Sequence, residues 1–258
     1  MKERPILFSG PMVRAILEGR KSQTRRVIKN ATGAFWDHAG WRPVVDGGRV
    51  DRWEDVDGRL APIGAGAPRP TCPYGEPGDR LWVRESLWHD DGMSAMQPTS
   101  IKYAADVIDP RPDQFFPVEN WRKVPSIHMP RWASRITLEI KDVRVERLQA
   151  ISEADAIAEG VECEVYELGV PISGCWWNYQ SRCWSGAFPD EPRGSFRTLW
   201  DSINGKTHPW SANPLVWVVE FAKVWLCRSA AGVWRMTTEN TSDAALASGG
   251  QAGKAGGA

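Results

Sequence analysis

Long apolar runs are absent from this sequence. No stretch approaches the roughly 18 consecutive apolar residues that a membrane-spanning helix needs, and the first five residues, MKERP, lack the apolar core of a signal peptide. Net charge is absent as well, because 32 Lys and Arg balance 32 Asp and Glu, so no general attraction to nucleic acid is expected. We therefore expect a cytoplasmic protein with no membrane partner, in which any anion binding comes from local basic clusters.

Cysteine is scarce and follows no motif. The five cysteines are odd in number and widely spaced, and no Cys-x-x-Cys pair occurs. A chain of this length needs no disulfides to hold its core, so reduced thiols are the simplest expectation. A metal site built from Cys72, His128 or the Cys175/Cys183 pair stays open as an alternative, but the spacing does not favour one. We predict neither a metal nor a cofactor.

Tryptophan, in contrast, is abundant, with 15 residues against seven Phe and four Tyr. A large ring with one N–H suits a core with polar edges, and it also suits stacking on bases. Core packing is the commoner use. Because 42% of the residues are hydrophobic, the chain has enough apolar side chains to build a substantial core.

Apolar periodicity along the chain predicts many short strands and few helices. Ser152 to Asp155 has the pattern of a capping box, and Gly160 ends the helix that it opens, so that Glu159 is its last residue. A polar pair at 141–142 indicates a turn within the clearest β region. The predicted strands lie at 5–8, 80–85, 102–103, 135–148 and 215–225, and the helices at 11–18, 153–159 and 196–203.

Three segments rich in Gly, Pro, Asp or Trp interrupt these elements, at about 31–76, 89–125 and 163–195, the first with room for one hairpin. Residues 237–258 cannot bury enough apolar surface to fold, which predicts a disordered tail after one domain over 1–236. The order of elements favours an α+β protein built on a small mixed β-barrel with flanking short helices, over a layered βαβ sheet.

The densest chemical signal is the segment Gly19–Arg26, GRKSQTRR, which follows a predicted helix and a sharp turn. Four cations and two hydroxyls within eight residues suit a cradle for an anion or a polar ring. A solvated basic turn is the simpler alternative. Lys21, Thr24 and Glu159 also offer a base, a nucleophile and an acid, because a lysine with a lowered pKa can accept a hydroxyl proton and a carboxylic acid can protonate a leaving amine.

Four segments together resemble the ASCH superfamily, a PUA-like β-barrel family common in bacteria and phages, and look like its large phage and prophage members. The matching segments are Pro5–Val27, Pro77–Glu85, Leu148–Gly160 and Asn213–Phe221. The resemblance implies a PUA-like fold with relatives that bind RNA or nucleotides. It also implies kinship with small bacterial amidohydrolases that remove the acetyl group from N4-acetylcytidine.

Those small enzymes have the pattern Gly-Arg-Lys-Thr-x-Thr-x-Arg, in which the lysine is the base, the second threonine the nucleophile and a glutamate near a helix end the acid. The resemblance therefore assigns these roles to Lys21, Thr24 and Glu159. Ser22 replaces the first threonine, and Arg25 stands where the small enzymes have an apolar residue.

The expected partner is a nucleoside, a nucleotide or RNA; the sequence does not predict the oligomeric state. The remaining candidate binding residues are Arg20, Ser22, Arg25, Arg26, Trp82 and Glu85. Trp82 either stacks on a base or packs in the barrel, and Glu85 faces either the pocket or solvent. A non-catalytic RNA- or DNA-binding phage accessory protein and a protein-interaction factor remain alternatives. The catalytic hypothesis requires Lys21 and Glu159 to meet in one cavity.

Overall fold

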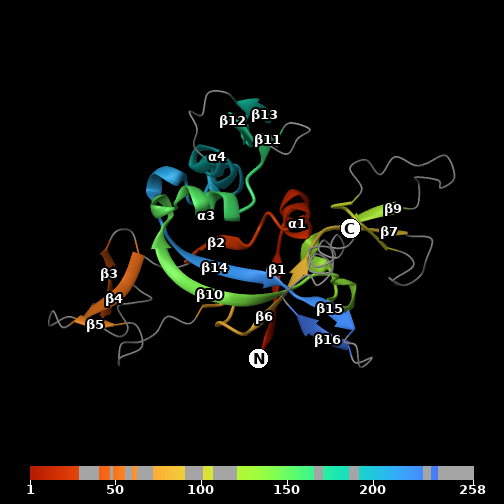
Figure 1. Cartoon of the computed structure of the whole chain (residues 1–258), viewed down its shortest axis with the longest axis horizontal. Coiled ribbons are helices and arrows are strands. Elements are labelled where there is room, and N and C mark those ends of the chain that lie inside the picture. Colours follow the sequence, from red (N-terminus) through yellow and green to blue (C-terminus); the bar gives the residue numbers. More distant parts are fainter. Residues whose placement is uncertain are drawn as a thin grey trace, which may run out of the picture.

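The long curved strand β10 (Thr137–Arg147) lies at the centre of the fold in the computed structural model (Figure 1). The structure describes residues 1–28, 41–46, 49–55, 60–62, 72–90, 101–106, 121–165, 171–185, 192–228 and 234–237. The protein is a mixed α+β structure with mostly sheet and a few short helices, as the sequence predicted.

The main sheet has the strand order β1-β6-β10-β14-β2, in which β1 and β6 are parallel and the other neighbours antiparallel. Among the described strands this path is open, with β1 and β2 at its two ends, so no closed barrel is formed. A hairpin and a third short strand from the first predicted insertion join the sheet through β4. The bounds are β1 Glu3–Leu7, β2 Gln23–Val27, β3 Trp41–Asp46, β4 Arg49–Asp55, β5 Leu60–Pro62, β6 Arg80–Arg84 and β14 Leu215–Lys223.

The turn predicted at 141–142 is wrong. β10 runs through Lys141 and Asp142 as one strand, and its register to β14 shifts between Ile140 and Asp142. Such a bulge lets two polar residues sit in a long strand without reversing the chain. The final predicted strand is also divided: β14 ends at Lys223, and a separate strand begins at Trp225.

Smaller sheets occupy the other two predicted insertions and the end of the described chain. They pair β7 with β8 and β9, β12 with β11 and β13, and β15 with β16. The bounds are β7 Leu87–Asp90, β8 Ile101–Tyr103, β9 Trp121–Val124, β11 Cys163–Val165, β12 Pro171–Asn178, β13 Cys183–Ser185, β15 Trp225–Arg228 and β16 Trp234–Thr237. Thr237, the first residue of the predicted tail, ends β16, and 238–258 lie outside the described residues.

Three helices, α1 (Gly10–Leu17), α3 (Glu153–Ala158) and α4 (Pro192–Asn204), lie on one side of the curved sheet (Figure 1). The capping box that opens α3 is confirmed, because Ser152 and Asp155 bond to each other's backbone N–H. Short 3-10 helices cover Ser126–His128, Arg131–Ala133, Leu148–Ala150 and Trp210–Ala212. Within the described part of the chain, no helix is long and apolar enough to span a membrane.

The core lies between the sheet and the helices and forms one apolar cluster. Val13 of α1, Leu138 of β10 and Val218 of β14 are fully buried in it. Two tryptophans, Trp200 and Trp217, also belong to this core, as expected for most of the Trp residues. In contrast, Trp132 is about half exposed.

Candidate functional site

A cavity of about 630 Å³ lies between the end of β1, strand β2, the end of α3 and helix α4. Its polar wall comes from β2 and the chain on either side of it, together with Glu159 after α3. The rest of the lining is largely apolar and aromatic. It consists of Leu7, Phe8, Ser9, Met12, Val27, Tyr74, Phe196, Leu199, Trp200, Ile203, Asn204, Thr207 and His208.

Lys21 and Glu159 meet in this cavity, as the catalytic hypothesis requires. The Lys21 Nζ donates to Glu159 Oε2 at 2.8 Å and to the Glu159 main-chain oxygen at 2.6 Å. The two side chains are only 2% and 4% exposed. Positive-φ glycines end both preceding helices, since Gly19 after α1 has φ +77° and Gly160 after α3 has φ +83°. These two chain reversals bring the lysine and the carboxylate together.

The pKa of Lys21 is lowered, and the largest cause is burial, which disfavours the charged amine. The nearby Glu159 carboxylate opposes this effect, and the positive charges of Arg26 and Arg25 reinforce it. A lowered pKa increases the fraction of neutral amine near neutral pH. A neutral amine can accept a proton from a hydroxyl group.

Thr24 lines the same cavity from the middle of β2, where its backbone is paired with Val219 of β14. The residue is 4% exposed. Among the residues that the structure describes, its hydroxyl has no hydrogen-bond partner. The hydroxyl is therefore free to bond to a ligand.

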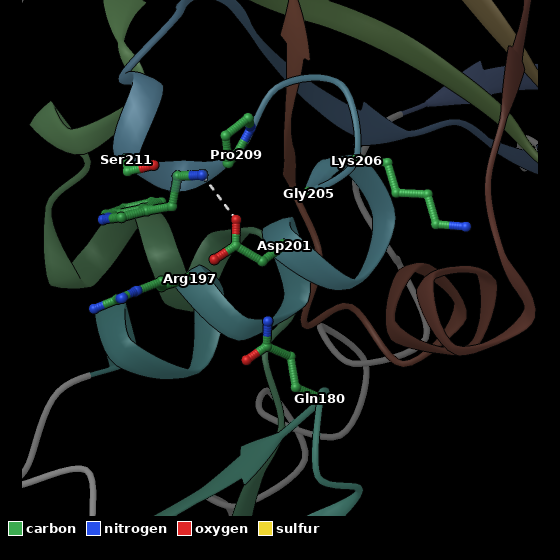
Figure 2. Close-up of a pocket in the computed structure, with 8 residues that line it drawn as sticks. Gln180, Arg197, Asp201, Gly205, Lys206, Pro209 and Ser211 are labelled. Carbon is green, nitrogen blue, oxygen red and sulfur yellow. Dashed lines mark hydrogen bonds between the residues drawn. The ribbon is translucent and has the colours of Figure 1, made fainter.

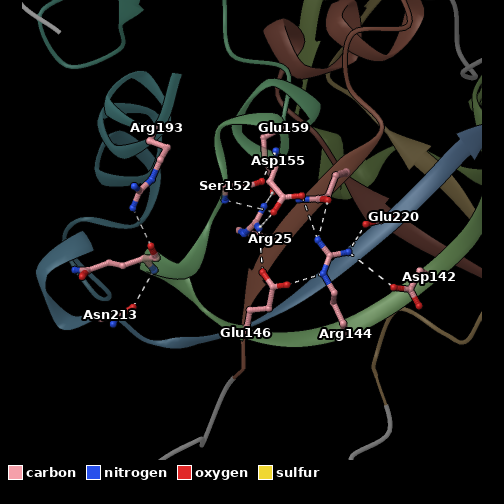
Figure 3. A network of polar contacts seen from close by, with 12 residues as sticks. Arg25, Asp142, Arg144, Glu146, Ser152, Asp155, Glu159, Arg193, Asn213 and Glu220 are labelled. Atoms are coloured by element: carbon pink, nitrogen blue, oxygen red, sulfur yellow. Dashed lines mark hydrogen bonds and ion pairs between the residues drawn. The ribbon is translucent and has the colours of Figure 1, made fainter. Parts of the chain in front are cut away.

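Arg25 is the centre of a buried ionic network rather than a solvated cation (Figure 3). Its side chain is 0% exposed, and its Nη2 lies 3.1 Å from both Glu146 Oε2 and Asp155 Oδ2. Its Nη1 lies 3.5 Å from Glu159 Oε1, so the same guanidinium also contacts the carboxylate that pairs with Lys21. The interpretation of this segment as a solvated basic turn is wrong for Arg25.

A second guanidinium, Arg144, extends this network along β10. It contacts Glu146 at 2.6 Å and Asp155 at 3.2 Å, and it also pairs with Glu220. Burial raises the pKa of Asp155, but the charges of Arg25 and Arg144 outweigh this effect, so the pKa is lowered. The Asp155 carboxylate is thus held ionised between two arginines.

Arg26 has different partners. Its Nη2 donates to the Leu7 main-chain oxygen at 2.6 Å, and its guanidinium carbon lies 5.3 Å from the centre of the Phe8 ring. Arg20 and Ser22, two other predicted binding residues, do not line the cavity. Arg20 pairs with Glu18 at 2.5 Å on the surface, and Ser22 is exposed.

Trp82 and Glu85 also lie outside the lining of the cavity. The ring of Trp82 has the guanidinium carbons of Arg84 and Arg131 at 5.3 and 5.7 Å. Glu85 is buried, and its two oxygens accept from Arg135 at 2.9 and 3.1 Å. Burial raises the pKa of this carboxyl, against the opposing effect of Arg135. Glu85 therefore forms an ion pair with Arg135 outside the cavity and does not contribute to its lining.

Several lining residues were not predicted from the sequence. The stripe of Phe196, Trp200 and Ile203 indicated a helix, but its spacing does not say that part of it faces a cavity. Tyr74 lies in a segment assigned to an insertion and reaches the cavity from there. His208 follows the end of α4, and its main-chain oxygen accepts from the indole N–H of Trp200 at 2.8 Å.

A second, smaller cavity of about 360 Å³ is formed by α4 and the turn that follows it (Figure 2). Asp201 Oδ1 accepts from the Trp210 main-chain N–H at 2.7 Å there. The two cations, Arg197 and Lys206, point away from one another and do not converge on a ligand position. This cavity therefore lacks the convergent groups of the first one.

No metal centre is evident among the described residues. In those ranges, no three His, Cys, Asp or Glu side chains are grouped so that they could hold a metal ion. Cys72 and Cys163 are free thiols, and burial raises the pKa of Cys72. Comparisons with models of protein families, with curated proteins and with solved structures found no match to this chain.

Proposed function

We propose that this chain is a PUA-like protein of the ASCH type whose cavity binds a modified nucleoside or nucleotide and hydrolyses an N-acyl amide on its exocyclic amine, as in N4-acetylcytidine. The observation that carries the proposal is the 2.8 Å contact between Lys21 and Glu159 in the cavity that Thr24 also lines. A potential base, acid and nucleophile thus line one cavity.

The PUA-like assignment is supported by how the two end strands of the main sheet approach each other. Arg26 of β2 donates a hydrogen bond to the main chain of Leu7 in β1. The sheet is open in its backbone pairing, yet it curls far enough for a side chain to link its ends. That curvature suits a small barrel with α1 connecting the two end strands.

The buried ion pair can supply both protonation states that the reaction needs. One proton moved from Lys21 Nζ to Glu159 Oε2 leaves a neutral amine and a carboxylic acid. The amine then serves as the base and the carboxylic acid as the acid. Burial favours the neutral amine of Lys21, because it disfavours the charged form of that group.

In the proposed reaction, Thr24 Oγ1 attacks the acyl carbon while Lys21 takes the hydroxyl proton. Collapse of the tetrahedral oxyanion breaks the C–N bond, and Glu159 protonates the departing amine, which leaves an ester on Thr24. Water then attacks the ester and gives its proton to the Glu159 carboxylate. The Thr24 oxygen leaves, regains a proton from Lys21, and the carboxylic acid product is released.

The aromatic residues of the lining are suited to a planar base. Phe8, Tyr74, Phe196 and Trp200 all contribute to the lining, and aromatic rings stack on nucleobases without requiring one particular base. A volume of about 630 Å³ is in the range of small-ligand sites.

The non-catalytic alternative, an RNA- or DNA-binding protein, relied on Arg25 and Arg26 as phosphate contacts. Arg25 is fully buried and contacts three carboxylates, so its charge is compensated inside the protein. No observation on the described residues favours this alternative or the protein-interaction factor over the enzyme.

The test is to incubate the purified protein with N4-acetylcytidine and to follow the release of cytidine by chromatography. We expect turnover by the wild-type protein and its loss in Lys21→Ala. Lys141→Ala is the matched control, because Lys141 also pairs with a glutamate, Glu139 at 2.7 Å, but is 43% exposed and outside the cavity. Absence of turnover, or equal rates in wild type and Lys21→Ala, contradicts the proposal.

A further inference from the structure

Arg26 differs from the other two cations of the cavity in having no carboxylate partner. Lys21 and Arg25 both contact Glu159. In the part of the chain that the structure describes, no carboxylate lies within ion-pair distance of Arg26, which donates to the Leu7 main-chain oxygen. Its Nε is buried and has no hydrogen-bond partner among those residues. Arg26 therefore brings to the cavity lining a positive charge that no described carboxylate compensates.

The position of this charge follows from the alternation of β2. Thr24 and Arg26 are two residues apart in the strand, so their side chains leave the same face, about 6.6 Å apart along it. Arg26 thus stands one strand repeat beyond the proposed nucleophile. Both residues line the cavity.

Tyr74 adds a hydroxyl group to the lining of the cavity. Burial raises the pKa of its phenol, and the nearby Arg26 acts in the opposite direction, which places the two side chains within electrostatic reach. With a raised pKa the phenol keeps its proton at neutral pH and can donate a hydrogen bond. A guanidinium and a phenol are both donors that suit the oxygens of a phosphate group.

We propose that Arg26, assisted by Tyr74, binds a phosphate group, and that the ligand of the cavity is therefore a nucleoside monophosphate rather than the free nucleoside. The inference rests on the proposed function, which places the acyl end of the ligand at Thr24. The ligand then lies along β2, with its acyl group at the Lys21–Glu159 pair and its phosphate at Arg26.

The first test is calorimetric binding of cytidine and cytidine 5′-monophosphate to the full chain. We expect the wild-type protein to bind the monophosphate about 10- to 100-fold more tightly, as one charge-assisted contact allows. Arg26→Gln should bind both ligands equally. Arg14→Gln is the control, because Arg14 also donates to a main-chain oxygen, that of Ala105 at 3.0 Å, but does not line the cavity.

Equal affinities in the wild-type protein, or a preference that survives in Arg26→Gln, overturns the inference. Arg26→Lys keeps the positive charge and should keep part of the preference for the monophosphate. This variant replaces Arg26→Gln in the test if Arg26→Gln does not unfold cooperatively on heating. The preference should also shrink as the pH falls below about 6, where a phosphate monoester loses its second charge.

The second test compares the turnover of N4-acetylcytidine with that of its 5′-monophosphate. We expect Arg26→Gln to raise the KM of the monophosphate about 10- to 100-fold more than the KM of the nucleoside. Because the charge of Arg26 helps to lower the pKa of Lys21, any change in kcat should be the same for both substrates. A KM that changes equally for both substrates overturns the inference. Preferential binding without any turnover refutes the proposed hydrolysis while the phosphate site stands.

Discussion

Gly160 and Lys21 are in direct contact behind the cavity. A Cβ on Gly160 would lie 2.9 Å from the Cβ of Lys21 and 3.0 Å from the Cβ of Ala15, and the glycine has φ +83°. Both the conformation and the packing therefore require glycine at this position. The residue that ends α3 thus also sets the place of the buried lysine.

Gly160→Ala should lower the free energy of unfolding by about 2–4 kcal/mol, since a left-handed residue with a Cβ and a close contact each add a cost. Gly78→Ala is the matched control, because Gly78 has φ +90° but a Cβ added there would meet no atom within 4 Å. Gly78→Ala should lower the free energy of unfolding by only about 1–2 kcal/mol. Chemical denaturation of both variants measures the difference, and equal losses would show that the contact with Lys21 is not tight.

Arg25→Gln should be among the most destabilising substitutions in the molecule. It leaves Glu146, Asp155 and Glu159 without their shared guanidinium, and breaking a buried ion pair costs about 3–5 kcal/mol. Arg20→Gln, which removes a surface pair with Glu18 and a long 3.5 Å hydrogen bond to the Gly160 main-chain oxygen, should cost less than about 1 kcal/mol. Urea unfolding at pH 7 compares the two.

The loss of unfolding free energy in Arg25→Gln should depend on pH. The pKa of Asp155 is lowered in the folded protein, so its ionised form adds stability above the unfolded value, and this stability is lost as the pH falls through the folded pKa. Without Arg25 the pKa of Asp155 loses the largest cause of its lowering, so this part of the stability is missing in the variant. We expect the deficit to be smaller at pH 3 than at pH 7, because pH 3 lies below the ordinary aspartate value of 3.8. A deficit that is equal at the two pH values would contradict the ionic interpretation.

Lys21 has a pH signature of the same sign, over a range that extends to higher pH. Its pKa is lowered on folding, so the unfolded chain binds more protons between the folded pKa and the ordinary value of 10.5. The burial of Lys21 therefore costs stability at low pH, and this cost disappears as the pH rises through that interval. Stability of Lys21→Met relative to the wild type should accordingly decline with rising pH, as measured by denaturant midpoints at several pH values.

Local signals in the sequence predicted local structure well. Ser152 and Asp155 are three residues apart, and a capping box needs nothing beyond them. The turn expected at 141–142 failed because two polar residues in a row are compatible with a bulge as well as a turn, and only the pairing with β14 decides between them.

The environment of Arg25 could not be predicted in this way. Its partners Glu146 and Glu159 are 121 and 134 residues distant in the sequence, and only the folded sheet and α3 bring them together. In sequence, Arg25 is one of several adjacent cations and looks solvated. The contact between Lys21 and Glu159 was expected from a resemblance to a family, not from their spacing in the sequence. Nothing in the sequence indicated that Tyr74 lines the cavity.

The most direct test of the central claim is the rate at which Thr24 variants release cytidine and acetate from N4-acetylcytidine. Thr24→Ser keeps a hydroxyl at the position and should retain activity within about tenfold, whereas Thr24→Ala should lose roughly a thousandfold or more. Both variants should unfold at denaturant midpoints close to that of the wild type. Equal rates of release by Thr24→Ala and the wild-type protein would contradict the account.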